Sequence, residues 1–428
     1  MRKELAFEKL DPFVFVTKLA GFEHSEYIQP NATKVPVDNT DIPMVQGKNI
    51  REGVFVEKYD WYISKKIADL LPRSILNKKC ILIPYVGSNL GEVGLFPNKY
   101  RCQLASNIAK LELKNDKYDL EYVMYYLQSP IGQSYLFQEK QGSSQPNITM
   151  ESIRNTQIIK KDILEQKKIV KILSLLTKKI ERNNCINDNL AQMLRLLYEQ
   201  WFYRFEFPNE QNLPYNRANG ELEWNDKLKR RIPKGWKVQT MLSNELFSVI
   251  SSGIDRFSTK KYYATADIIG TSIGEGSDIE YETRESRANM QPVINSIWFA
   301  KMKNSIKHLF LNKEMSSFVD NSILSTGFYG LKCNEISFEY IASVVSAPIF
   351  EITKDRLSHG ATQQGIGDDD MANITLLIPD DTILRKYHEA TKGFFAKISN
   401  NILENKRLIA IRNFLLPLLM NGQATIAE

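Results

Sequence analysis

The chain has few of the residues that build metal centres and disulfide frameworks. Its four cysteines lie at Cys80, Cys102, Cys185 and Cys333, and its four histidines at His24, His308, His359 and His388. Neither set has the spacing of a metal-ligand motif or a disulfide framework. We therefore expect no metal site in this chain, and we expect reduced thiols in a cytoplasmic protein.

Long apolar runs and catalytic motifs are missing as well. No apolar run reaches membrane-spanning length, and the N-terminal MRKELAFEKL lacks the apolar core of a signal peptide. There is no G-x-S-x-G motif and no phosphate-binding loop of the Walker type. Asp11-Pro12-Phe13 lacks the second proline of the amino-group methyltransferase motif, and Glu112-Leu113-Lys114 has no Asp shortly before it to complete a nuclease site. These absences predict a non-catalytic protein.

Charge of one sign is also scarce. The 428 residues include 56 Lys and Arg against 50 Asp and Glu, a net charge of +6, and 43% of them are hydrophobic. This composition is typical of a soluble protein of two or three domains. So small an excess of positive charge does not by itself indicate a nucleic-acid partner.

Glycine and proline are absent from residues 147–207, and this stretch contains a heptad seam. The seam consists of Ile169, Leu173, Leu176, Ile180, Asn183, Asn187, Leu190, Leu194, Leu197 and Trp201. Adding 218 to each number gives a second seam, of Tyr387, Thr391, Phe394, Ile398, Asn401, Asn405, Leu408, Arg412, Leu415 and Leu419. The pattern predicts two long helices that pack along each other, the second of which we expect to stop at Pro417.

The same offset relates residues far upstream of the helices. Glu121-Tyr122 recurs as Glu339-Tyr340, and Pro130-Ile131 recurs as Pro348-Ile349. One constant offset over about eighty residues indicates a duplicated unit, each copy a variable body followed by a long helix. Outside this shared region the two bodies do not visibly align.

Two asparagines occupy the same slots of both seams. Asn in a seam costs stability and fixes register and partner. If the helices pair antiparallel about their midpoints, Asn183 meets Asn405 and Asn187 meets Asn401. The sequence alone leaves a parallel pairing open.

Candidate DNA contacts are basic, hydroxyl and amide side chains in turns of the two bodies, because such groups suit phosphates and base edges. They are Lys48, Arg51, Ser88, Asn89, Ser144 and Gln145 in the first body and Arg284, Arg287, Lys301, Thr362 and Gln363 in the second. The alternative is that these residues belong to an ordinary polar surface or cap their own backbone.

Several features together resemble the specificity subunit of type I restriction-modification systems. They are the duplicated plan, the loop Gly142-Ser143-Ser144-Gln145-Pro146-Asn147-Ile148, the segment from Trp201 to Trp236, and the ending Leu415-Leu416-Pro417-Leu418-Leu419-Met420-Asn421-Gly422. The resemblance covers essentially the whole chain. It implies an α+β fold, with two α/β target-recognition domains separated by two long helices that pair as an antiparallel coiled coil with a pseudo-twofold internal repeat.

The resemblance also implies a DNA-binding function without catalysis. The expected partners are double-stranded DNA with a two-part target, two adenine-methylating modification subunits, and restriction subunits. This chain is expected to carry no cofactor, whereas its partners would use S-adenosylmethionine, ATP and Mg. Gln364-Gly365 replaces Pro146-Asn147 in the second copy, and Thr391 and Arg412 interrupt its seam. These departures predict that the second half docks its partner subunit less symmetrically than the family pattern implies.

The expected domains follow from the repeat. They are a first target-recognition domain at 1–160, a spacer helix at 161–203, a linker at 204–235, a second target-recognition domain at 236–379, a second spacer helix at 380–419 and a tail at 420–428. Two other functional classes stay open at this point. One is a coiled-coil scaffold with two protein-binding β domains, and the other is a methyltransferase or nuclease with degenerate motifs.

Overall fold

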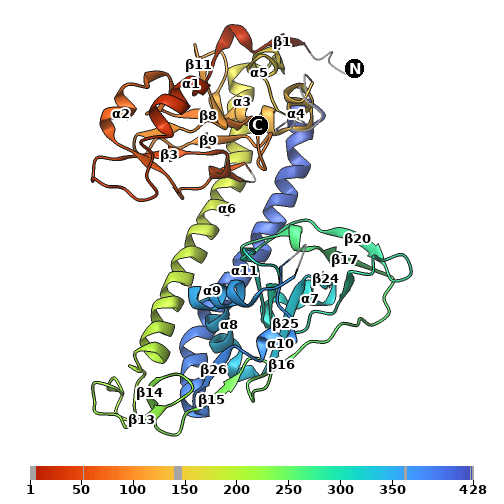
Figure 1. The fold of residues 1–428 in the computed structure, drawn as a ribbon. Coiled ribbons are helices and arrows are strands. Elements are labelled where there is room, and N and C mark those ends of the chain that lie inside the picture. Colours follow the sequence, from red (N-terminus) through yellow and green to blue (C-terminus); the bar gives the residue numbers. More distant parts are fainter. Residues whose placement is uncertain (1–5, 52, 139–146, 361–363, 425, 427–428) are drawn as a thin grey trace. The chain divides into compact units, whose positions relative to one another are not determined.

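The chain folds into two compact units. A computed structural model describes residues 6–51, 53–138, 147–360, 364–424 and 426. Unit 1 consists of Met1–Glu181 with Leu408–Glu428, and unit 2 of Arg182–Arg407. The division falls within both long helices, α6 (Ile163–Tyr198) and α11 (Asp381–Met420), so each unit contains one body and a segment of each helix (Figure 1).

Unit 1 is built on two small sheets. One has the order β2 (Val14–Lys18), β11 (Ile108–Leu113), β8 (Cys80–Pro84), β9 (Gly94–Phe96), and the other β6 (Tyr62–Ile63), β3 (Ile42–Val45), β10 (Cys102–Leu104), β7 (Ile75–Leu76). Strand β1 (Phe7–Lys9) pairs with β12 (Gln157–Ile159), and β4 (Ile50–Arg51) pairs with β5 (Val54–Phe55). The shorter helices are α1 (Gly21–Glu23), α2 (Lys65–Asp69), α3 (Leu120–Gln128), α4 (Pro130–Leu136) and α5 (Met150–Asn155).

Unit 2 has the same plan. Its sheets have the orders β16 (Phe247–Val249), β25 (Phe328–Cys333), β22 (Ser296–Ala300), β23 (His308–Leu311), and β20 (Ser277–Glu280), β17 (Thr259–Tyr263), β24 (Ser322–Ser325), β21 (Ala288–Met290). The strand pairs are β15 (Lys237–Thr240) with β26 (Thr375–Ile378), β18 (Ile268–Ile269) with β19 (Ser272–Ile273), and β13 (Leu222–Asn225) with β14 (Arg230–Pro233). The shorter helices are α7 (Ser316–Asp320), α8 (Phe338–Ser346), α9 (Pro348–Leu357) and α10 (Asp368–Met371).

The duplication therefore includes the strands of both bodies, with β13–β14 as an addition in unit 2, and the amino-acid sequence did not reveal this. The short helix Gly47–Asn49 precedes β4, and the short helix Thr265–Asp267 precedes β18, at the same offset of 218 residues as the long helices. The pairs β3·β10 and β17·β24 are both parallel. The bodies look unrelated in sequence because a sheet core needs alternating apolar residues of suitable volume rather than particular ones.

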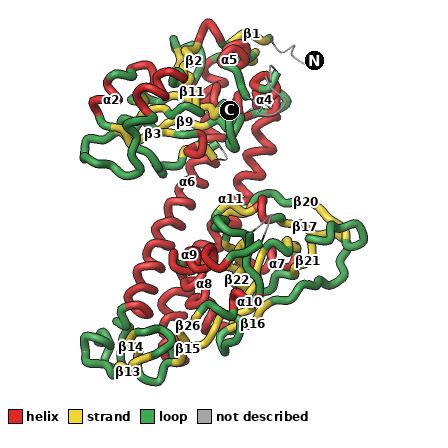
Figure 2. Tube along the Cα trace, viewed as in Figure 1, coloured by secondary structure: helices red, strands yellow, loops and turns green. Residues whose placement is uncertain are grey.

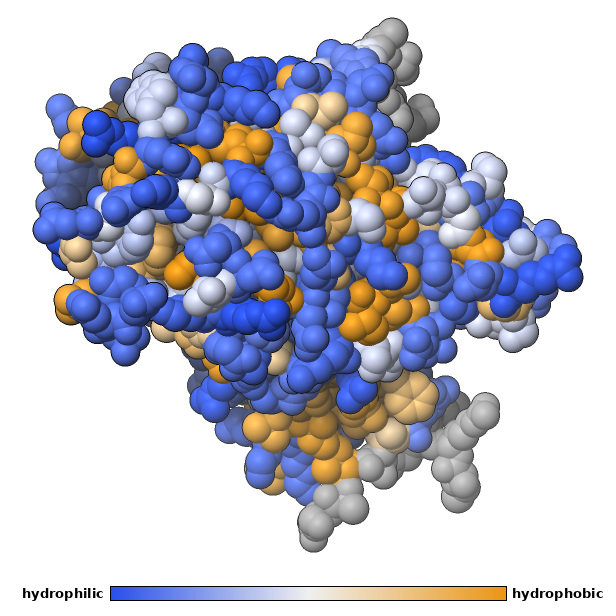
Figure 3. Space-filling model, turned by 90° about the horizontal axis from the view of Figure 1, so that it is seen from below, coloured by the Kyte–Doolittle hydropathy of each residue, from blue (hydrophilic) through white to orange (hydrophobic). Residues whose placement is uncertain are grey.

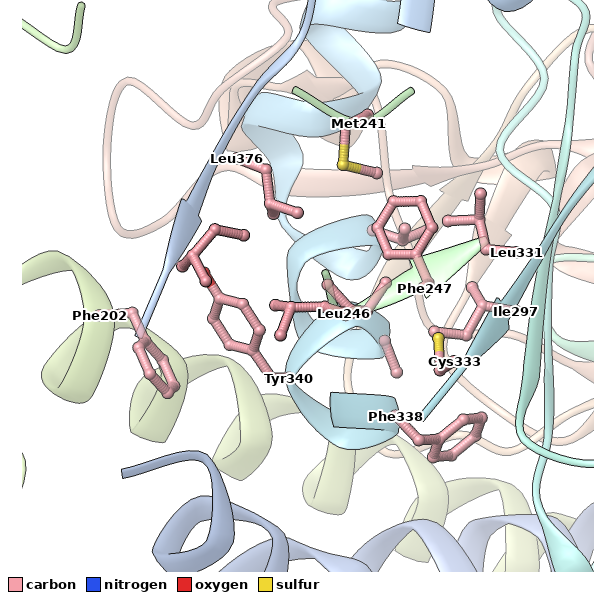
Figure 4. Close-up of a cluster of buried hydrophobic side chains, with 14 of the residues drawn as sticks. Phe202, Met241, Leu246, Phe247, Ile297, Leu331, Cys333, Phe338, Tyr340 and Leu376 are labelled. Carbon is pink, nitrogen blue, oxygen red and sulfur yellow. The ribbon is translucent and has the colours of Figure 1, made fainter. Parts of the chain in front are cut away.

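Within unit 2, an aromatic cluster anchors the helix pair to the body. The Phe202 ring lies 4.5 Å from the ring of Tyr340 on α8 and 4.9 Å from that of Tyr387 on α11, measured between centroids. Phe202 and Tyr340 are among the buried side chains drawn in Figure 4, where the β16–β25–β22 side chains Phe247, Leu331 and Ile297 line the other side of the cluster.

The segment 204–235 also contributes to this core. Phe207 stacks on Trp236 with ring centroids 5.2 Å apart, and Ile232 of β14 is buried in the same cluster. The residues expected to form a linker therefore pack against the second body. Figure 2 shows their short strands and loops beside the long helices of that unit.

The helices pack antiparallel within each unit. In unit 1 the start of α6, with Ile169 and Leu173, shares a core with Leu416 and Leu419 near the end of α11. In unit 2 the end of α6, with Leu194, shares a core with Ile383 and Leu384 at the start of α11. The parallel alternative is excluded, and the α+β fold expected from the resemblance is confirmed.

The expectation that the second helix stops at Pro417 is wrong. Helix α11 continues to Met420 with Pro417 inside it, and the backbone NH of Asn421 donates to the Pro417 carbonyl at 3.0 Å. Proline costs this helix a hydrogen bond. The buried side chains of Leu416, Leu419 and Met420 supply packing that offsets this loss.

Candidate nucleic-acid interface

In unit 1, the four described candidate residues gather around strand β4. The Asn89 side-chain amide donates to the carbonyl of Ile50 at 3.1 Å, and the Ser88 hydroxyl donates to Asn89 Oδ1 at 3.1 Å. Lys48 lies just before β4, and the exposed Arg51 ends it. The β4–β5 hairpin and the loop between β8 and β9 thus form one polar surface, although 40 residues separate Lys48 from Ser88.

Buried Asn49 fixes the shape of this surface and was not among the predicted residues. Its Nδ2 donates to the carbonyls of Val56 at 2.8 Å and Lys58 at 2.9 Å, and its Oδ1 accepts from the backbone NH of Gln46 at 2.8 Å. Asn commonly makes such bonds in turns, so its place in a polar turn was the available signal. These three bonds tie the two ends of the segment 46–58 together.

The electrostatics of the unit 1 surface favour an anion. Burial lowers the pKa of the Lys48 amine, and the neighbouring Lys58 and Arg51 lower it further. Lys48 also pairs with Asp60, at the exposed edge of the surface. Three cations held close together repel one another, and a phosphate group would relieve that repulsion.

Two glutamines hold the unit 1 surface from behind. Gln128 Nε2, at the end of α3, donates to the Val93 carbonyl at 2.7 Å, and Gln133 Nε2, in α4, donates to the Gly91 carbonyl at 2.9 Å. Gly53 NH donates to Glu92 Oε2 at 3.2 Å, which joins the hairpin to the loop. The surface is therefore built on hydrogen bonds to a rigid helical support.

In unit 2, two of the three described candidates, Arg287 and Lys301, flank the turn Thr326–Gly327 between β24 and β25. The Lys301 backbone NH donates to the Gly327 carbonyl at 2.9 Å, and the Arg287 carbonyl accepts from the backbone NH of Thr326 at 2.9 Å. The Arg287 side chain is exposed. Burial lowers the pKa of the Lys301 amine, although Asp368 opposes this shift.

Arg284 is tied to its own strand end. Its guanidinium lies 4.1 Å from the ring centroid of Tyr281, and Nη1 donates to the Tyr281 carbonyl. Stacking of this kind holds the side chain in place. Ser144, Gln145, Thr362 and Gln363 lie outside the described residues, so the structure does not place them.

The asparagines of the two seams form the expected antiparallel pairs. Asn183 Nδ2 donates to Asn405 Oδ1 at 2.9 Å, and Asn401 Nδ2 donates to Asn187 Oδ1 at 2.8 Å. Glu404 and Asn184, which were not predicted, complete the network: Glu404 accepts from Asn183 at 2.8 Å, and Asn184 accepts from Asn405 at 2.7 Å. Glu404 is half-buried, so this seam contact includes a carboxylate as well as amides.

Within the described ranges, no cluster of three or more His, Cys, Asp and Glu side chains could hold a metal ion. No single helix of the described residues is long and apolar enough to cross a membrane. Among the residues that the structure describes, one bent pair of helices, Glu335–Ser346 and Pro348–Leu357, is long and apolar enough when its two parts are taken together. Helix α8, which makes up most of the first of these segments, has seven residues buried in the unit 2 body.

Comparison with known proteins independently supports the resemblance to type I restriction-modification specificity subunits. Residues 30–192 match the type I restriction modification DNA specificity domain. The chain is 25% identical over 409 residues to the type I restriction enzyme MjaIX specificity subunit of Methanocaldococcus jannaschii, a match that covers 91% of this chain and 88% of that protein. It is 22% identical over 349 residues to the HindI specificity subunit of Haemophilus influenzae, covering 67% and 72%.

A crystal structure of the S subunit of a type I restriction-modification system from M. genitalium has a similar fold. The TM-score is 0.51 at 14% sequence identity, and the match covers 98% of this chain and 96% of that one. Two duplicated α+β bodies on an antiparallel helix pair, with a DNA specificity domain in the sequence, define a DNA-recognition protein. The chain is thus similar along most of its length to a specificity subunit of type I restriction enzymes, and residues 30–192 match the DNA specificity domain of type I restriction-modification systems.

Proposed function

We propose that this chain recognises a two-part double-stranded DNA target, one half with each body, and that the helix pair sets the length of the unread spacer. The observation that carries the proposal is the repetition of the whole body, with the same strand orders, on two helices joined by Asn183–Asn405 and Asn187–Asn401. Recognition domains then lie within residues 1–160 and 236–379, and the spacer within 161–203 and 380–419.

Physical linkage explains why two modest surfaces suffice. Once one body is bound, the other is held near its own half-site at a raised effective concentration. A wrong base would cost roughly 1–3 kcal/mol in either half. The spacing between the halves becomes a geometric property of the protein, as in other two-part DNA-binding proteins.

The proposed contacts divide by chemistry. Lys48 and Arg51 in unit 1 and Arg284, Arg287 and Lys301 in unit 2 suit phosphates and guanine edges, whereas Ser88 and Asn89 suit other base edges. Ser144, Gln145, Thr362 and Gln363 remain candidates by their chemistry alone.

Two exposed apolar pairs support docking of two copies of one partner. On α6 the side chains of Met193 and Leu196 are 51% and 56% exposed, and on α11 those of Ile411 and Phe414 are 47% and 67% exposed. The second pair stands 218 residues after the first, the offset of the duplication. Figure 3 shows that apolar patches interrupt an otherwise mostly hydrophilic face of the molecule. Single exposed apolar residues are ordinary, but a repeated pair fits two identical partners.

We propose that these partners are modification subunits, which methylate adenine with S-adenosylmethionine, and that restriction subunits join the same complex. The polar seam residues Thr391 and Arg412 of the second helix are buried, whereas the corresponding seam residues of the first helix are apolar. The side chains beneath the docking surface therefore differ between the two helices. This difference concerns the affinity of the two docking sites rather than their number.

The test is methylation sequencing of DNA from cells that express the chain with its modification subunit. A seven-residue insert with Leu at both seam positions is placed in each helix, between Glu181 and Arg182 and between Arg407 and Leu408, where contacts inside each unit are kept. The pair lengthens by about 10.5 Å, or about three base pairs, which also turns the second half-site by about 100° around the DNA axis.

The proposal predicts that the native chain methylates adenine in two half-sites with a fixed gap. The insert is expected to change the gap or abolish methylation, and any surviving half-sites keep their bases. Altered half-site bases with an unchanged gap would overturn the spacer role. Binding by the native chain that does not weaken with salt would instead indicate a protein scaffold.

A further inference from the structure

The loop between β22 and β23 in unit 2 takes the place of the β8–β9 loop in unit 1. Both loops join the third and fourth strands of equivalent sheets, and both contact the neighbouring short hairpin. In unit 1, Asn89 donates to Ile50 of β4. In unit 2, the backbone NH of His308 donates to the Gly270 carbonyl, in the turn of the β18–β19 hairpin, at 2.9 Å.

The β22–β23 loop presents cations and apolar side chains to solvent. Ile306 is 61% exposed and Met302 39% exposed, and Ile269 on the adjoining hairpin is 46% exposed. Lys303 is exposed and bonded to Gln364 Oε1 at 2.9 Å, whereas Lys307 donates to the Thr265 carbonyl. Lysines suit DNA phosphates, and a branched apolar side chain suits the methyl group of thymine in the major groove.

Helix α9 holds this loop through a fully buried lysine. Lys354 Nζ donates to the carbonyl of Ser305 at 2.9 Å and to that of Ala300, the last residue of β22, at 3.3 Å. The next residue, Asp355, accepts the backbone NH of Asn304 at 2.9 Å through Oδ1. One helical turn therefore fixes both the start and the middle of the loop.

A buried charge cluster supports Lys354. Glu351 Oε2 lies 2.5 Å from Lys354 Nζ, and Glu351 Oε1 lies 2.8 Å from His308 Nε2. Burial by itself raises the pKa of the Glu351 carboxyl, but the bonds from His308 and Lys354 lower it overall. Burying such charges is expensive, and apolar residues of similar volume often give equal or greater stability.

In unit 1, the equivalent helix α4 holds the β8–β9 loop through an uncharged side chain. Gln133 and Leu136 stand 218 residues before Glu351 and Lys354, and Gln133 donates its amide to Gly91 of the β8–β9 loop. A neutral amide thus suffices to hold a loop from this helix. Lys354 donates to two carbonyls at the start and in the middle of the loop, and its counterpart Leu136 cannot make such bonds. Stability alone therefore does not account for the charged cluster in unit 2.

We propose that the loop Met302–Lys307 binds the second half-site of double-stranded DNA, with Ile306 against a base edge and Lys303 and Lys307 against phosphates, and that Lys354 is the residue that positions it. The inference rests on the proposed two-part recognition and deepens it. It adds residues to unit 2 that the sequence did not suggest, since only Lys301 at the start of the loop was a candidate.

The test uses the full chain with its modification subunit and DNA duplexes that carry the methylated motif found by sequencing. Ile306→Ala is expected to reduce discrimination at one base pair of the second half-site roughly tenfold and to leave the first half-site unchanged. Lys303→Ala is expected to weaken binding to all duplexes and to lower the salt slope by about one.

Lys332→Ala is the matched control, because Lys332 is an exposed lysine at the other end of the same sheet, opposite Ser296. It should leave both half-sites and the salt slope unchanged. If Ile306→Ala and Lys303→Ala behave like this control, the loop does not contact DNA.

The positioning role is tested by separating recognition from stability. Lys354→Met leaves His308 as the remaining partner of Glu351 within the cluster. This variant is expected to lower both the discrimination at the second half-site and the stability of the protein. Adding Glu351→Gln removes the buried charge, so the double variant should regain stability in urea unfolding while second-half discrimination stays reduced. Native discrimination in the double variant would overturn the role of Lys354.

The two proposals fail separately. If the native chain shows no salt-dependent binding to a two-part site, the proposed function is wrong. If the native chain does bind such a site and the loop variants discriminate normally, only the role of the loop is wrong.

Discussion

Asn183 and Asn405 are joined by a side-chain hydrogen bond of 2.9 Å, and the same relationship recurs 218 residues along the duplication between Asn401 and Asn187. Both pairs belong to unit 2, which holds the centre of the antiparallel helix pair. Because Asn183 also donates to Glu404, its amide group serves two acceptors from one buried position.

Replacing Asn183 with Leu should destabilise the protein by about 1–3 kcal/mol, because Asn405 and Glu404 then lose a donor in a buried place. Replacing both Asn183 and Asn405 with Leu removes the two buried amides, while exposed Asn184 and half-buried Glu404 can bond to water instead. Stability should then return to the native level or exceed it. Urea unfolding measures the difference. Gln192→Leu, on an exposed position of the same helix, is the control.

The same double variant should lose uniform spacing. An all-apolar seam permits neighbouring registers, since register is then set by packing alone. Methylation sequencing should show more than one gap length between unchanged half-sites. A single gap, together with restored stability, would mean that the asparagines do not set the register.

The apolar pairs on the helices predict the number of docked modification subunits. Met193→Ser with Leu196→Ser should leave one bound subunit instead of two, and Ile411→Ser with Phe414→Ser should remove the other, as measured by native mass spectrometry. Leu175→Ser is a matched control, because Leu175 is 61% exposed but its counterpart is Gly393. Two bound subunits in either double variant would contradict the docking site.

Lys406 makes the stability of unit 2 depend on pH. Its amine contacts the Tyr263 hydroxyl, and burial, reinforced by Lys261, lowers its pKa to about 8. Because the unfolded chain holds this proton up to about pH 10 and the folded chain does not, the contribution of Lys406 to stability rises with pH between about 8 and 10.

The measurement is urea unfolding across this window for the native chain and for Lys406→Met. Only the difference between them is informative, because buried thiols such as Cys80, with its pKa raised to about 12, act in the opposite direction. The native chain should gain stability relative to the variant as pH rises. Parallel pH profiles would show that Lys406 remains charged.

Pro417 should be replaceable with a gain in stability. Pro417→Ala restores a backbone donor within α11 and is expected to add about 1–3 kcal/mol to unit 1. Urea unfolding checks this, with Lys178→Ala on the exposed side of α6 as a control. A loss of stability would mean that the proline shapes the packing of Leu416 and Leu419.

The helix pair was predictable because its information is periodic and local. The seam, the offset of 218 and the two repeated asparagines are enough to name Asn405 as the partner of Asn183 in an antiparallel pair. The direction of pairing itself is visible only in the cores that the helix ends share. Helix α6 begins at Ile163, within the expected range 161–203, and its regular part ends at Tyr198, before the wider turn Glu199–Tyr203 that contains Trp201.

The candidate site was predictable only in part. Lys48 and Asn89 meet around β4 as polar turn residues of one surface, but nothing in the sequence showed that they were neighbours. The cluster of His308, Glu351 and Lys354 is assembled from a strand and a helix that are far apart in the chain. Packing of loops and helices against the sheets creates such neighbours, and it leaves no periodic signal in the sequence.

The discontinuous composition of unit 1 has a consequence for biosynthesis. Unit 2 is one uninterrupted stretch of chain, whereas the core of unit 1 includes Leu416, Leu419 and Met420. At about 5–20 residues per second, the ribosome delivers these last side chains about 12–48 s after the end of the first segment at Glu181. The half of the protein that is translated first is therefore completed last.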